Sequence, residues 1–497
     1  MPKTVGLESS IEAESALELA SRAPNTMLID GDWSGGTNSN WFDVIDPADG
    51  SKIASVVNGT QDDGLRAVAA AASAAEGWKA KSPRQRSDIL MRCFHLMTER
   101  AEFLARLITA ENGKALPDAR GEVSYAAEFF RWYAEESPRD FSELAIAPSG
   151  ANRIVVQHQP IGVAVLITPW NFPAAMATRK IAPALAAGCT CILKPAAETP
   201  LTALAIGAIM LEAGVPAGVV NIVTTTSAGE VVNAMLHDPR VRKLSFTGST
   251  GVGKILLKEA ADQVISSSME LGGNAPFIVF DDADLESAVA GAMVAKMRNG
   301  GEACTAANRF YVQRGIYDAF VQRLTDEMSA LKVGRGLDAG IQLGPLITPA
   351  AVAKVERLVL DAVNRGAKIV TGGTKIAGPG YFYPPTVLSE VVPGSDILNE
   401  EIFGPVAAII PFETQEEVIA LANNTEYGLV SYIYSADHKR AFFVAGEIES
   451  GMVGVNRGIV SDAAAPFGGM KQSGLGREGG RHGMLEYVEM KYIAASW

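Results

Sequence analysis

Cysteine is scarce in this sequence. Only four occur in 497 residues, at positions 93, 189, 191 and 304. So few thiols do not make a disulfide framework, and their number is typical of a reducing compartment. Cys189 and Cys191 are separated by a single threonine, but no histidine or further cysteine lies near them. We therefore expect buried strand thiols at these two positions and no metal site.

Long apolar runs are also absent. A membrane helix needs about 18 consecutive apolar residues. Ile161–Ile167 and Ile181–Leu193 are too short and are interrupted by Gly or Pro. The first 25 residues have no basic segment followed by an apolar one, so no secretory signal is visible. These absences predict a cytoplasmic protein that has no membrane partner.

An excess of positive charge is missing too. The formal net charge is −13 at pH 7 and no basic patch stands out, which excludes nucleic acid as a general partner. Any anionic ligand must therefore be held by local arginines or lysines. Apolar residues make up 48% of the chain and charged residues 20%, which predicts a large folded core. The chain is long enough to form about three domains.

The middle of the chain alternates apolar strands with helices. Strands are expected at Ile161–Ile167 and Thr190–Leu193, each leading into a Pro-rich loop. Thr199 and Pro200 then predict a helix start, with the threonine as N-cap. The alternation continues through Val219–Val223, Val231–Leu236, Lys243–Phe246 and Gly253–Ala261. This pattern predicts an α/β fold with a parallel sheet, whose ligands bind beyond the carboxyl ends of the strands.

The flanking regions complete this organisation. Residues 1 to 25 predict an extension or a loosely attached helix. Scaffold helices are expected at Asp62–Trp78, Pro83–Ile108 and Val123–Glu136. A second α/β unit is expected from strand Pro276–Phe280 to about residue 470, with helices Asp284–Asn299, Tyr317–Leu331, Ala350–Asn364 and Gln415–Asn423 and strand Leu429–Tyr434.

A thiol follows the helix predicted at Asp284–Asn299. Gly300 and Gly301 end that helix and let the backbone approach another group closely. Cys304 comes next among small residues, where a substrate can reach it. It is a candidate nucleophile. The alternative is a buried structural thiol, because free cysteine behaves as a small hydrophobe.

A glycine-rich loop at Gly248–Lys254 approaches the phosphate-binding loop of nucleotide hydrolases. That loop needs Ser or Thr after the lysine to hold magnesium, and position 255 is Ile. The alternative is a dinucleotide pyrophosphate held by backbone N–H groups at the start of the following helix. The glycine order does not match the dinucleotide fingerprint either. The loop alone therefore indicates no particular nucleotide.

Six motifs together resemble those of the aldehyde dehydrogenase superfamily. They are Thr168–Pro173 (TPWNFP), Phe246–Ser249 (FTGS), Met269–Asn274 (MELGGN), Gly301–Cys304 (GEAC), Glu400–Pro405 (EEIFGP) and Pro466–Gly469 (PFGG). They occur in family order, within a match from about Asp30 to Tyr492. The resemblance implies a Rossmann-like dinucleotide-binding domain, an α/β catalytic domain and a small β oligomerisation extension.

By this resemblance Cys304 is the nucleophile, forming a thiohemiacetal and then a thioester. The side-chain amide of Asn171 and the backbone N–H of Cys304 are the oxyanion donors. Glu270 resembles the general base that activates water against the thioester. Without the other motifs, Glu270 beside two glycines would be interpreted as a solvated turn residue.

Cofactor contacts are implied in the same way. The implied contacts are Thr168, Trp170, Lys194, Ala197, Gly248, Ser249, Leu271, Glu401 and Phe403. Members that prefer NAD often have Glu at the position of Ala197, where it binds the ribose hydroxyls. Alanine removes a charge that would repel a 2′-phosphate. We therefore expect NADP as the cofactor, with NAD as a poorer substitute.

The substrate prediction depends on a narrower resemblance to succinate-semialdehyde dehydrogenases. Arg179, Arg298 and Ser461 match the positions that hold the distal carboxylate of the substrate. An arginine fork can donate two hydrogen bonds to one carboxylate. Either arginine alone would be interpreted as a helix-end or surface ion-pair residue. The alternative function is an aldehyde dehydrogenase of broad or different specificity, acting on glutarate semialdehyde or on aliphatic or aromatic aldehydes.

Two positions depart from many relatives. Glu302 replaces a common Gln, and Ala306 replaces a second Cys that some relatives have. A disulfide switch between two neighbouring thiols is therefore excluded. The domains are expected at 1–140 with 160–271 for the dinucleotide, 272–480 for catalysis, and 141–159 with 481–497 for assembly into a homodimer or homotetramer.

Overall fold

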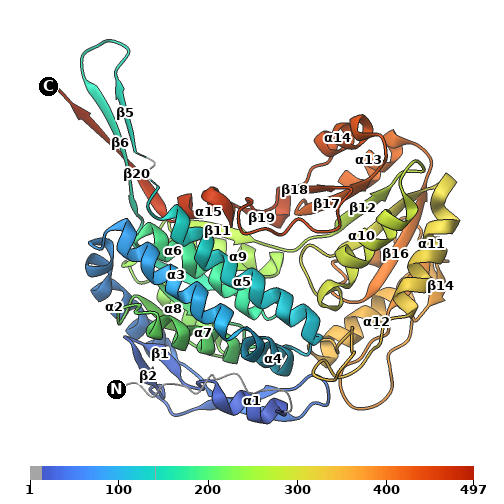
Figure 1. Ribbon diagram of the computed structural model, residues 1–497, viewed down its shortest axis with the longest axis horizontal. Coiled ribbons are helices and arrows are strands. Elements are labelled where there is room, and N and C mark those ends of the chain that lie inside the picture. Colours follow the sequence, from blue (N-terminus) through green and yellow to red (C-terminus); the bar gives the residue numbers. More distant parts are fainter. Residues whose placement is uncertain (1–13, 140–141) are drawn as a thin grey trace.

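The computed structural model describes residues 14–139 and 142–497 and has two α/β lobes with a projecting arm (Figure 1). In the first lobe an eight-stranded sheet has five parallel central strands and antiparallel edges. Its spatial order is β19 (Gly474–Leu475), β11 (Ser266–Glu270), β10 (Val241–Thr247), β7 (Val163–Ile167), β8 (Thr190–Lys194), β9 (Val220–Ile222), β1 (Met27–Ile29) and β2 (Asp32–Ser34). The predicted parallel sheet is confirmed.

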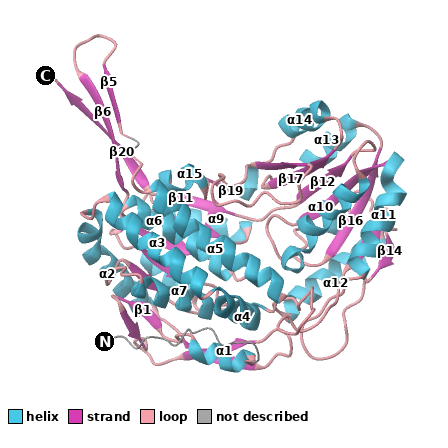
Figure 2. Ribbon diagram, in the orientation of Figure 1, coloured by secondary structure: helices cyan, strands magenta, loops and turns pink. Residues whose placement is uncertain are grey.

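Helices pack on this sheet, as Figure 2 shows. The helices in contact with its strands are α2 (Gln61–Lys79), α6 (Pro173–Ala187), α7 (Pro200–Glu212), α8 (Ala228–Leu236) and α9 (Thr250–Ala261). Three more helices, α3 (Pro83–Glu99), α4 (Ala101–Asn112) and α5 (Leu116–Glu136), pack on α6 and α7. The single helix expected over Pro83–Ile108 is wrong, because the backbone at Arg100 leaves the helical region (φ −102°, ψ 19°). No glycine or proline marks this break, so periodicity alone did not reveal it.

The N-terminal helix α1 (Ala16–Arg22) is not loosely attached. It packs against α4, and Ala16, Leu19 and Ala20 are buried in the core of the first lobe. A capping box at Ser15 and Glu18 fixes its start. The part of the expectation that concerns residues 1–13 lies outside the described residues.

The second lobe is a seven-stranded sheet that is parallel except at one edge. Its order is β14 (Lys368–Thr371), β15 (Thr386–Ser389), β16 (Val406–Phe412), β13 (Ala307–Gln313), β12 (Ala275–Val279), β17 (Val430–Tyr434) and β18 (Met452–Val455). Its helices are α10 (Leu285–Met297), α11 (Arg314–Ser329), α12 (Pro349–Asn364), α13 (Gln415–Asn423) and α14 (His438–Glu447). The predicted second α/β unit is therefore confirmed.

The two sheets meet end to end. The chain leaves the carboxyl end of β11 at Glu270 and starts β12 at Ala275, only a short turn later. The carboxyl ends of the first sheet therefore face the amino ends of the second. A ligand bound beyond the first sheet lies against the segments that precede β13 and β16.

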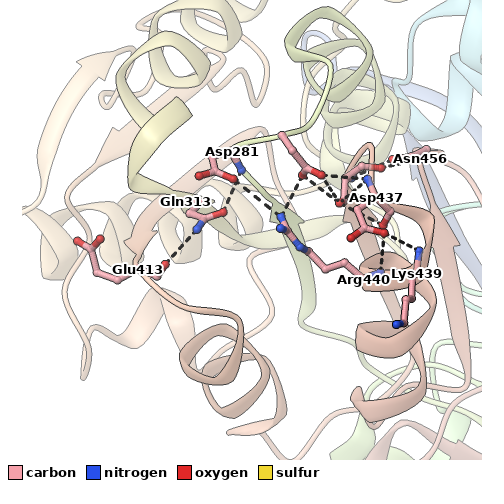
Figure 3. Close-up of polar contacts among 9 residues, drawn as sticks. Asp281, Gln313, Glu413, Asp437, Lys439, Arg440 and Asn456 are labelled. Atoms are coloured by element: carbon pink, nitrogen blue, oxygen red, sulfur yellow. Dashed lines mark hydrogen bonds and ion pairs between the residues drawn. The ribbon is translucent and has the colours of Figure 1, made fainter.

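The opposite end of the second sheet is closed by polar contacts (Figure 3). Gln313 accepts a hydrogen bond from the Asp281 N–H at 3.0 Å and donates one to the Glu413 carbonyl at 3.0 Å. Arg440 pairs with Asp282 at 3.2 Å and lies over the Phe280 ring. The protein's own side chains thus contact one another at the carboxyl ends of this sheet, whereas the carboxyl ends of β7 and β10 in the first sheet border a pocket.

The arm is a three-stranded sheet of β5 (Glu143–Ile146), β6 (Arg153–Pro160) and β20 (Val488–Ala495). The exposed pairing strand expected at Arg153–His158 is its central strand, paired on both sides. A two-stranded sheet of β3 (Trp41–Ile45) and β4 (Lys52–Val57) and a short helix α15 (Gly480–Leu485) complete the fold. None of the helices in the described part of the chain is long and apolar enough to cross a membrane.

Buried carboxylates cap two of the helices behind the site. Thr199 is the N-cap residue of α7 and Pro200 its first residue, as predicted, but the Thr199 hydroxyl donates to the Trp170 carbonyl and does not cap the helix. The Glu111 carboxylate accepts the N–H groups of Leu201 and Thr202 at 2.8 and 2.9 Å. Burial raises the pKa of Glu111 to about 8. Glu122 caps α6 in the same way.

Candidate active site

Cys304 is positioned by a tight left-handed turn after α10. The expected helix to Asn299 ends at Met297, because Asn299, Gly300 and Gly301 all have positive φ, between 54° and 79°. A Cβ on Gly301 would lie 2.3 Å from the Gly404 carbonyl oxygen, so only glycine fits there. Cys304 is partly exposed and lines a pocket between the lobes. The other three cysteines are buried and free, and the burial predicted for Cys189 and Cys191 is confirmed.

The electrostatics around this sulfur favour the thiol when no ligand is present. Burial raises the pKa of Cys304 to about 12, and the Arg179 guanidinium opposes this rise. The carboxylates of Glu401 and Glu270 raise the pKa further, and Arg298 lowers it. The thiolate therefore needs a base, or further positive charge, to form at neutral pH.

Asn171 is held beside the nucleophile. Its side-chain Nδ2 donates to the Glu302 carbonyl at 2.9 Å. Its backbone carbonyl accepts from Lys114 Nζ at 2.6 Å and from Asn299 Nδ2 at 3.0 Å. An amide group carries two N–H donors, so one remains for a ligand. The arrangement aims a fixed donor at the space in front of Cys304.

Glu270 ends β11 with a buried carboxylate whose Oε2 has no hydrogen-bond partner within the described chain. Burial raises its pKa well above the usual range, and the negative charge of Glu478 raises it further. Arg179, Lys180 and Arg477 act in the opposite direction. An unpartnered buried carboxylate of this kind is ready to take a proton.

Arg179 forms an ion pair with another side chain. The resemblance assigns it a substrate contact, whereas in the structure its guanidinium is buried, pairs with Glu478 at 2.5 Å and lies over the Phe467 ring. Lys180 also pairs with Glu478. Arg179 therefore acts on Cys304 and Glu270 through its charge.

Most of the predicted cofactor residues meet in one pocket. It is lined by the expected Trp170, Asn171, Gly248, Ser249, Leu271, Cys304, Glu401 and Phe403, and also by Pro169, Met176, Thr247, Gly272, Ala351 and Lys354. The Trp170 and Phe403 rings contact each other edge to face, with centroids 5.4 Å apart. Glu401 accepts the Gly273 N–H at 3.2 Å.

The donor set of this pocket fits an anionic dinucleotide. Ser249 caps α9, so the N–H groups and positive dipole of its first turn face the pocket. Three of the expected cofactor residues, Thr168, Lys194 and Ala197, do not line this pocket. Lys194 ends β8, the strand next to β7, and is buried without an ion pair to any residue described. Thr168 donates its N–H to the Lys194 carbonyl, and Ala197 follows β8 with a partly exposed side chain. The Glu198 carboxylate acts on Lys194 only from beyond ion-pair distance. A buried lysine that lacks an ion pair is suited to hold a phosphate or ribose oxygen.

The phosphate-loop alternative is excluded by the geometry. Lys254 Nζ donates to Gln472 Oε1 at 2.6 Å. Ile255, at the position that would need a metal-binding hydroxyl, has a side chain that is 58% exposed. Within residues 14–139 and 142–497, no cluster of His, Cys, Asp or Glu could hold a metal ion.

Arg298 and Ser461 lie together on the other side of the nucleophile. Arg298 Nη2 is 3.5 Å from Ser461 Oγ and 3.4 Å from Thr305 Oγ1, next to Cys304. Its guanidinium lies 5.2 Å from the Phe172 ring centroid. No carboxylate of the described chain pairs with it, so this half-buried charge is free to bind an anion.

Sequence reasoning missed five charged residues of the site. Glu478, Lys180, Lys354 and the buried Lys114–Glu122 pair belong to no motif that was assigned a role. The adjacent Arg179 and Lys180 in an apolar helix were the available signal, because two buried cations require a carboxylate. Glu302 also has a structural role, since its carboxylate accepts the Ile347 N–H at 3.2 Å and burial raises its pKa to about 8.

Comparison with known proteins agrees with this geometry. The profile of the aldehyde dehydrogenase family matches residues 33–493. A succinate-semialdehyde dehydrogenase from Paenarthrobacter nicotinovorans is 54% identical, covering 89% of this chain and 98% of the relative. An NADP(+) succinate-semialdehyde dehydrogenase from Escherichia coli K12 and a glutarate-semialdehyde dehydrogenase from Pseudomonas aeruginosa are each 49% identical, covering 94% of this chain and 96% of each relative.

A solved crystal structure has the same fold as this chain. The crystal structure titled as an E. coli NADP-dependent enzyme superposes with a TM-score of 0.94 at 49% identity, covering 96% of this chain and 98% of that one. The shared fold and the profile match over nearly the whole sequence leave one conclusion. This chain belongs to the aldehyde dehydrogenase family.

Proposed function

We propose that this enzyme oxidises succinate semialdehyde to succinate, with NADP preferred and NAD as a poorer substitute. The observation that carries the proposal is Arg298, an unpaired guanidinium beside Ser461 and Thr305, close to Cys304. Such a group binds a distal carboxylate while the aldehyde carbon meets the sulfur. The names of the relatives support the same substrate.

The proposed reaction begins with addition of the Cys304 thiolate to the aldehyde carbon, giving a thiohemiacetal. The free N–H of the Asn171 amide and the Cys304 backbone N–H donate to the oxyanion. One such donor is typically worth about 10²–10³ in rate. When bound, the nicotinamide cofactor supplies the hydride acceptor for the oxidation. A thioester on Cys304 results, and Glu270 takes a proton from the water that hydrolyses it.

The residues proposed to hold the cofactor lie at the ends of the first sheet and on the facing loop. Lys194 and Thr168 would hold the adenosine ribose, next to Ala197. Gly248, Ser249 and Leu271 would hold the pyrophosphate, and Trp170, Glu401 and Phe403 would hold the nicotinamide ribose and ring. The pocket supports the assignments of Trp170, Gly248, Ser249, Leu271, Glu401 and Phe403, which line it together. The assignment of Lys194 is supported by its burial without an ion pair to any described residue.

Replacement of Arg298 by alanine tests the proposed substrate. The Arg298→Ala enzyme should show a KM for succinate semialdehyde raised about 10- to 100-fold, because a charged hydrogen-bonding partner of the carboxylate is lost. The KM for butanal, which has the same chain length and no carboxylate, should change little. Initial rates of NADPH formation measure both constants.

A conservative variant controls for charge. Arg298→Lys keeps the cation but lacks the planar fork, so it should recover only part of the loss. Equal increases in KM for the semialdehyde and for butanal would show that the proposed carboxylate contact does not exist.

A substitution at Ala197 tests the cofactor. In Ala197→Glu a carboxylate would repel the 2′-phosphate and accept hydrogen bonds from the ribose hydroxyls of NAD. The ratio of kcat/KM for NADP to that for NAD should fall by about tenfold or more, since one charge contact of this kind is worth about 1.5–3 kcal/mol. Steady-state kinetics with both cofactors measures this ratio. A wild-type enzyme that strongly prefers NAD would overturn the assignment.

A second candidate substrate is glutarate semialdehyde, one methylene longer. It is favoured by the glutarate-semialdehyde dehydrogenase relative at 49% identity. Kinetics with succinate semialdehyde, glutarate semialdehyde and simple aliphatic aldehydes separate these specificities. A flat profile across the panel would indicate a broad aldehyde dehydrogenase instead.

The assembly and location are part of the same proposal. The arm leaves Leu144, Ile146, Met490 and Tyr492 at least 60% exposed, which supports pairing into a homodimer or homotetramer. The proposed domains are 1–140 with 160–271 for the dinucleotide, 272–480 for catalysis, and 141–159 with 481–497 for assembly. Strand β19 returns to the first sheet at Gly474, before the end of the proposed catalytic domain. Residues 140–141 lie outside the described ranges. Four free cysteines support a cytoplasmic location.

A further inference from the structure

A second cavity lies on the substrate side of the enzyme. One wall is α5, through Tyr125 and Trp132, and the other is the loop that begins at Ser461. Ser461 contacts Arg298, which in turn contacts the residue after Cys304. The cavity therefore adjoins, through Ser461, the groups proposed to receive the distal carboxylate.

Two hydrogen-bond donors in this cavity are unused. The phenol oxygen of Tyr125 and the indole Nε1 of Trp132 are both buried, and neither finds an acceptor in the described chain. Buried polar groups without partners are uncommon in folded proteins, and each calls for an explanation. Two such donors along one cavity indicate a ligand that accepts hydrogen bonds.

The surroundings of the two donors differ. Tyr125 lies within the field of Arg179 and Arg298, whose positive charges oppose the rise in its phenol pKa that burial causes. Arg179 is already paired with Glu478. Arg298 has no ion-pair partner among the described residues. Neither guanidinium can accept the phenol proton, because arginine has no acceptor. The Tyr125 hydroxyl is thus a hydrogen-bond donor without an acceptor, and it lies next to a positive charge without a counterion.

Trp132 lies seven residues further along α5, about 10 Å along the helix axis. The carboxylates of Glu128 and Glu135 line the same stretch of the cavity. Glu128 is paired with Arg131 at 2.8 Å, whereas Glu135 is exposed. A substrate carboxylate near Trp132 would meet negative charge, so its favourable position is at Tyr125.

We propose that Tyr125 is a specificity-determining residue, whose phenol O–H donates to the distal carboxylate of the substrate together with Arg298 and Ser461. A carboxylate has two oxygens and about four acceptor sites, enough for a guanidinium, a serine and a phenol. This inference depends on the proposed function, because it assigns Tyr125 to the carboxylate of a semialdehyde. Aldehydes without an acidic group gain nothing from the phenol.

The test is the Tyr125→Phe enzyme, assayed with saturating NADP on succinate semialdehyde and on butanal. The KM for succinate semialdehyde should rise about 10- to 100-fold, the range of a hydrogen bond to a charged group. The kcat should change less than about twofold, and both constants for butanal should stay at their wild-type values, because the ring that shapes the cavity is kept. A general loss of packing would affect the two aldehydes alike.

The matched control is Tyr383→Phe. Tyr383 is also a buried tyrosine whose hydroxyl has no partner in the described residues, but it belongs to the core of the second lobe. This variant should leave the constants for both aldehydes unchanged. It therefore separates the removal of any buried phenol from the removal of the one at the cavity.

The outcomes distinguish this inference from the function on which it depends. A wild-type enzyme that does not favour succinate semialdehyde over butanal overturns the proposed function, and the inference with it. A wild-type enzyme that favours the semialdehyde, combined with a Tyr125→Phe enzyme that keeps the whole preference, overturns the inference alone. A preference that shrinks in Tyr125→Phe and persists in Tyr383→Phe supports both.

Discussion

The Cys304→Ser enzyme should lose aldehyde oxidation, with kcat lower by about 10⁴- to 10⁶-fold, the range seen when a nucleophile is removed from a preorganised site. Serine keeps the size of the side chain, but its hydroxyl is a far weaker nucleophile and has no dedicated base. The sulfur itself is partly exposed in the pocket and flanked by Arg179 and Arg298. The rate of NADPH formation measures the loss.

A second thiol supplies the control for this substitution. Cys93 is fully buried in α3, and burial raises its pKa to about 12 as well. Cys93→Ala should retain the wild-type kcat, although its free energy of unfolding should fall because a buried side chain is truncated. An unchanged rate in Cys304→Ser would contradict the whole mechanism, because no other described cysteine reaches the pocket.

The motifs of the site were recognisable from sequence because they lie at strand ends and tight turns. Each of these motifs is a short run of residues in which the backbone geometry sets the direction of the chain or requires a glycine. The runs contain Trp170, Gly248, Glu270 and Cys304. The residues that define each motif are therefore only a few positions apart in the sequence. The structure then confirms the α/β architecture that the alternation of strands and helices predicted.

Long-range partners could not be predicted in this way. Glu478 lies 298 residues from Lys180, and no local pattern in the sequence joins them. Glu478 also pairs with Arg179. Arg179 is therefore placed beside a carboxylate of the protein, and the substrate contact that the resemblance implied for it could not be checked before the fold was known. The break at Arg100 was missed for a different reason, because its side chain has no special backbone preference.

The second large effect is expected at Glu270. In Glu270→Gln the amide cannot take a proton from water, so hydrolysis of the thioester should slow by about 10²- to 10⁴-fold. Thiohemiacetal formation and oxidation do not need this step, and a stoichiometric burst of NADPH should therefore remain. Rapid-mixing kinetics resolves the burst from the slow steady state. Glu111→Gln, which alters a buried carboxylate that caps α7, should keep wild-type turnover.

The same residue should set the pH dependence of deacylation. Burial and the charge of Glu478 raise the pKa of Glu270 well above its ordinary value, so the carboxylate is protonated and inactive at low pH. A base acts only when deprotonated, and the deacylation rate should therefore rise with pH through this raised pKa. In Glu270→Gln that rise should disappear, leaving only the dependence on hydroxide. Wild-type deacylation that stays constant from acidic to alkaline pH, or that Glu270→Gln leaves unaltered, would assign the water-activating role to another group.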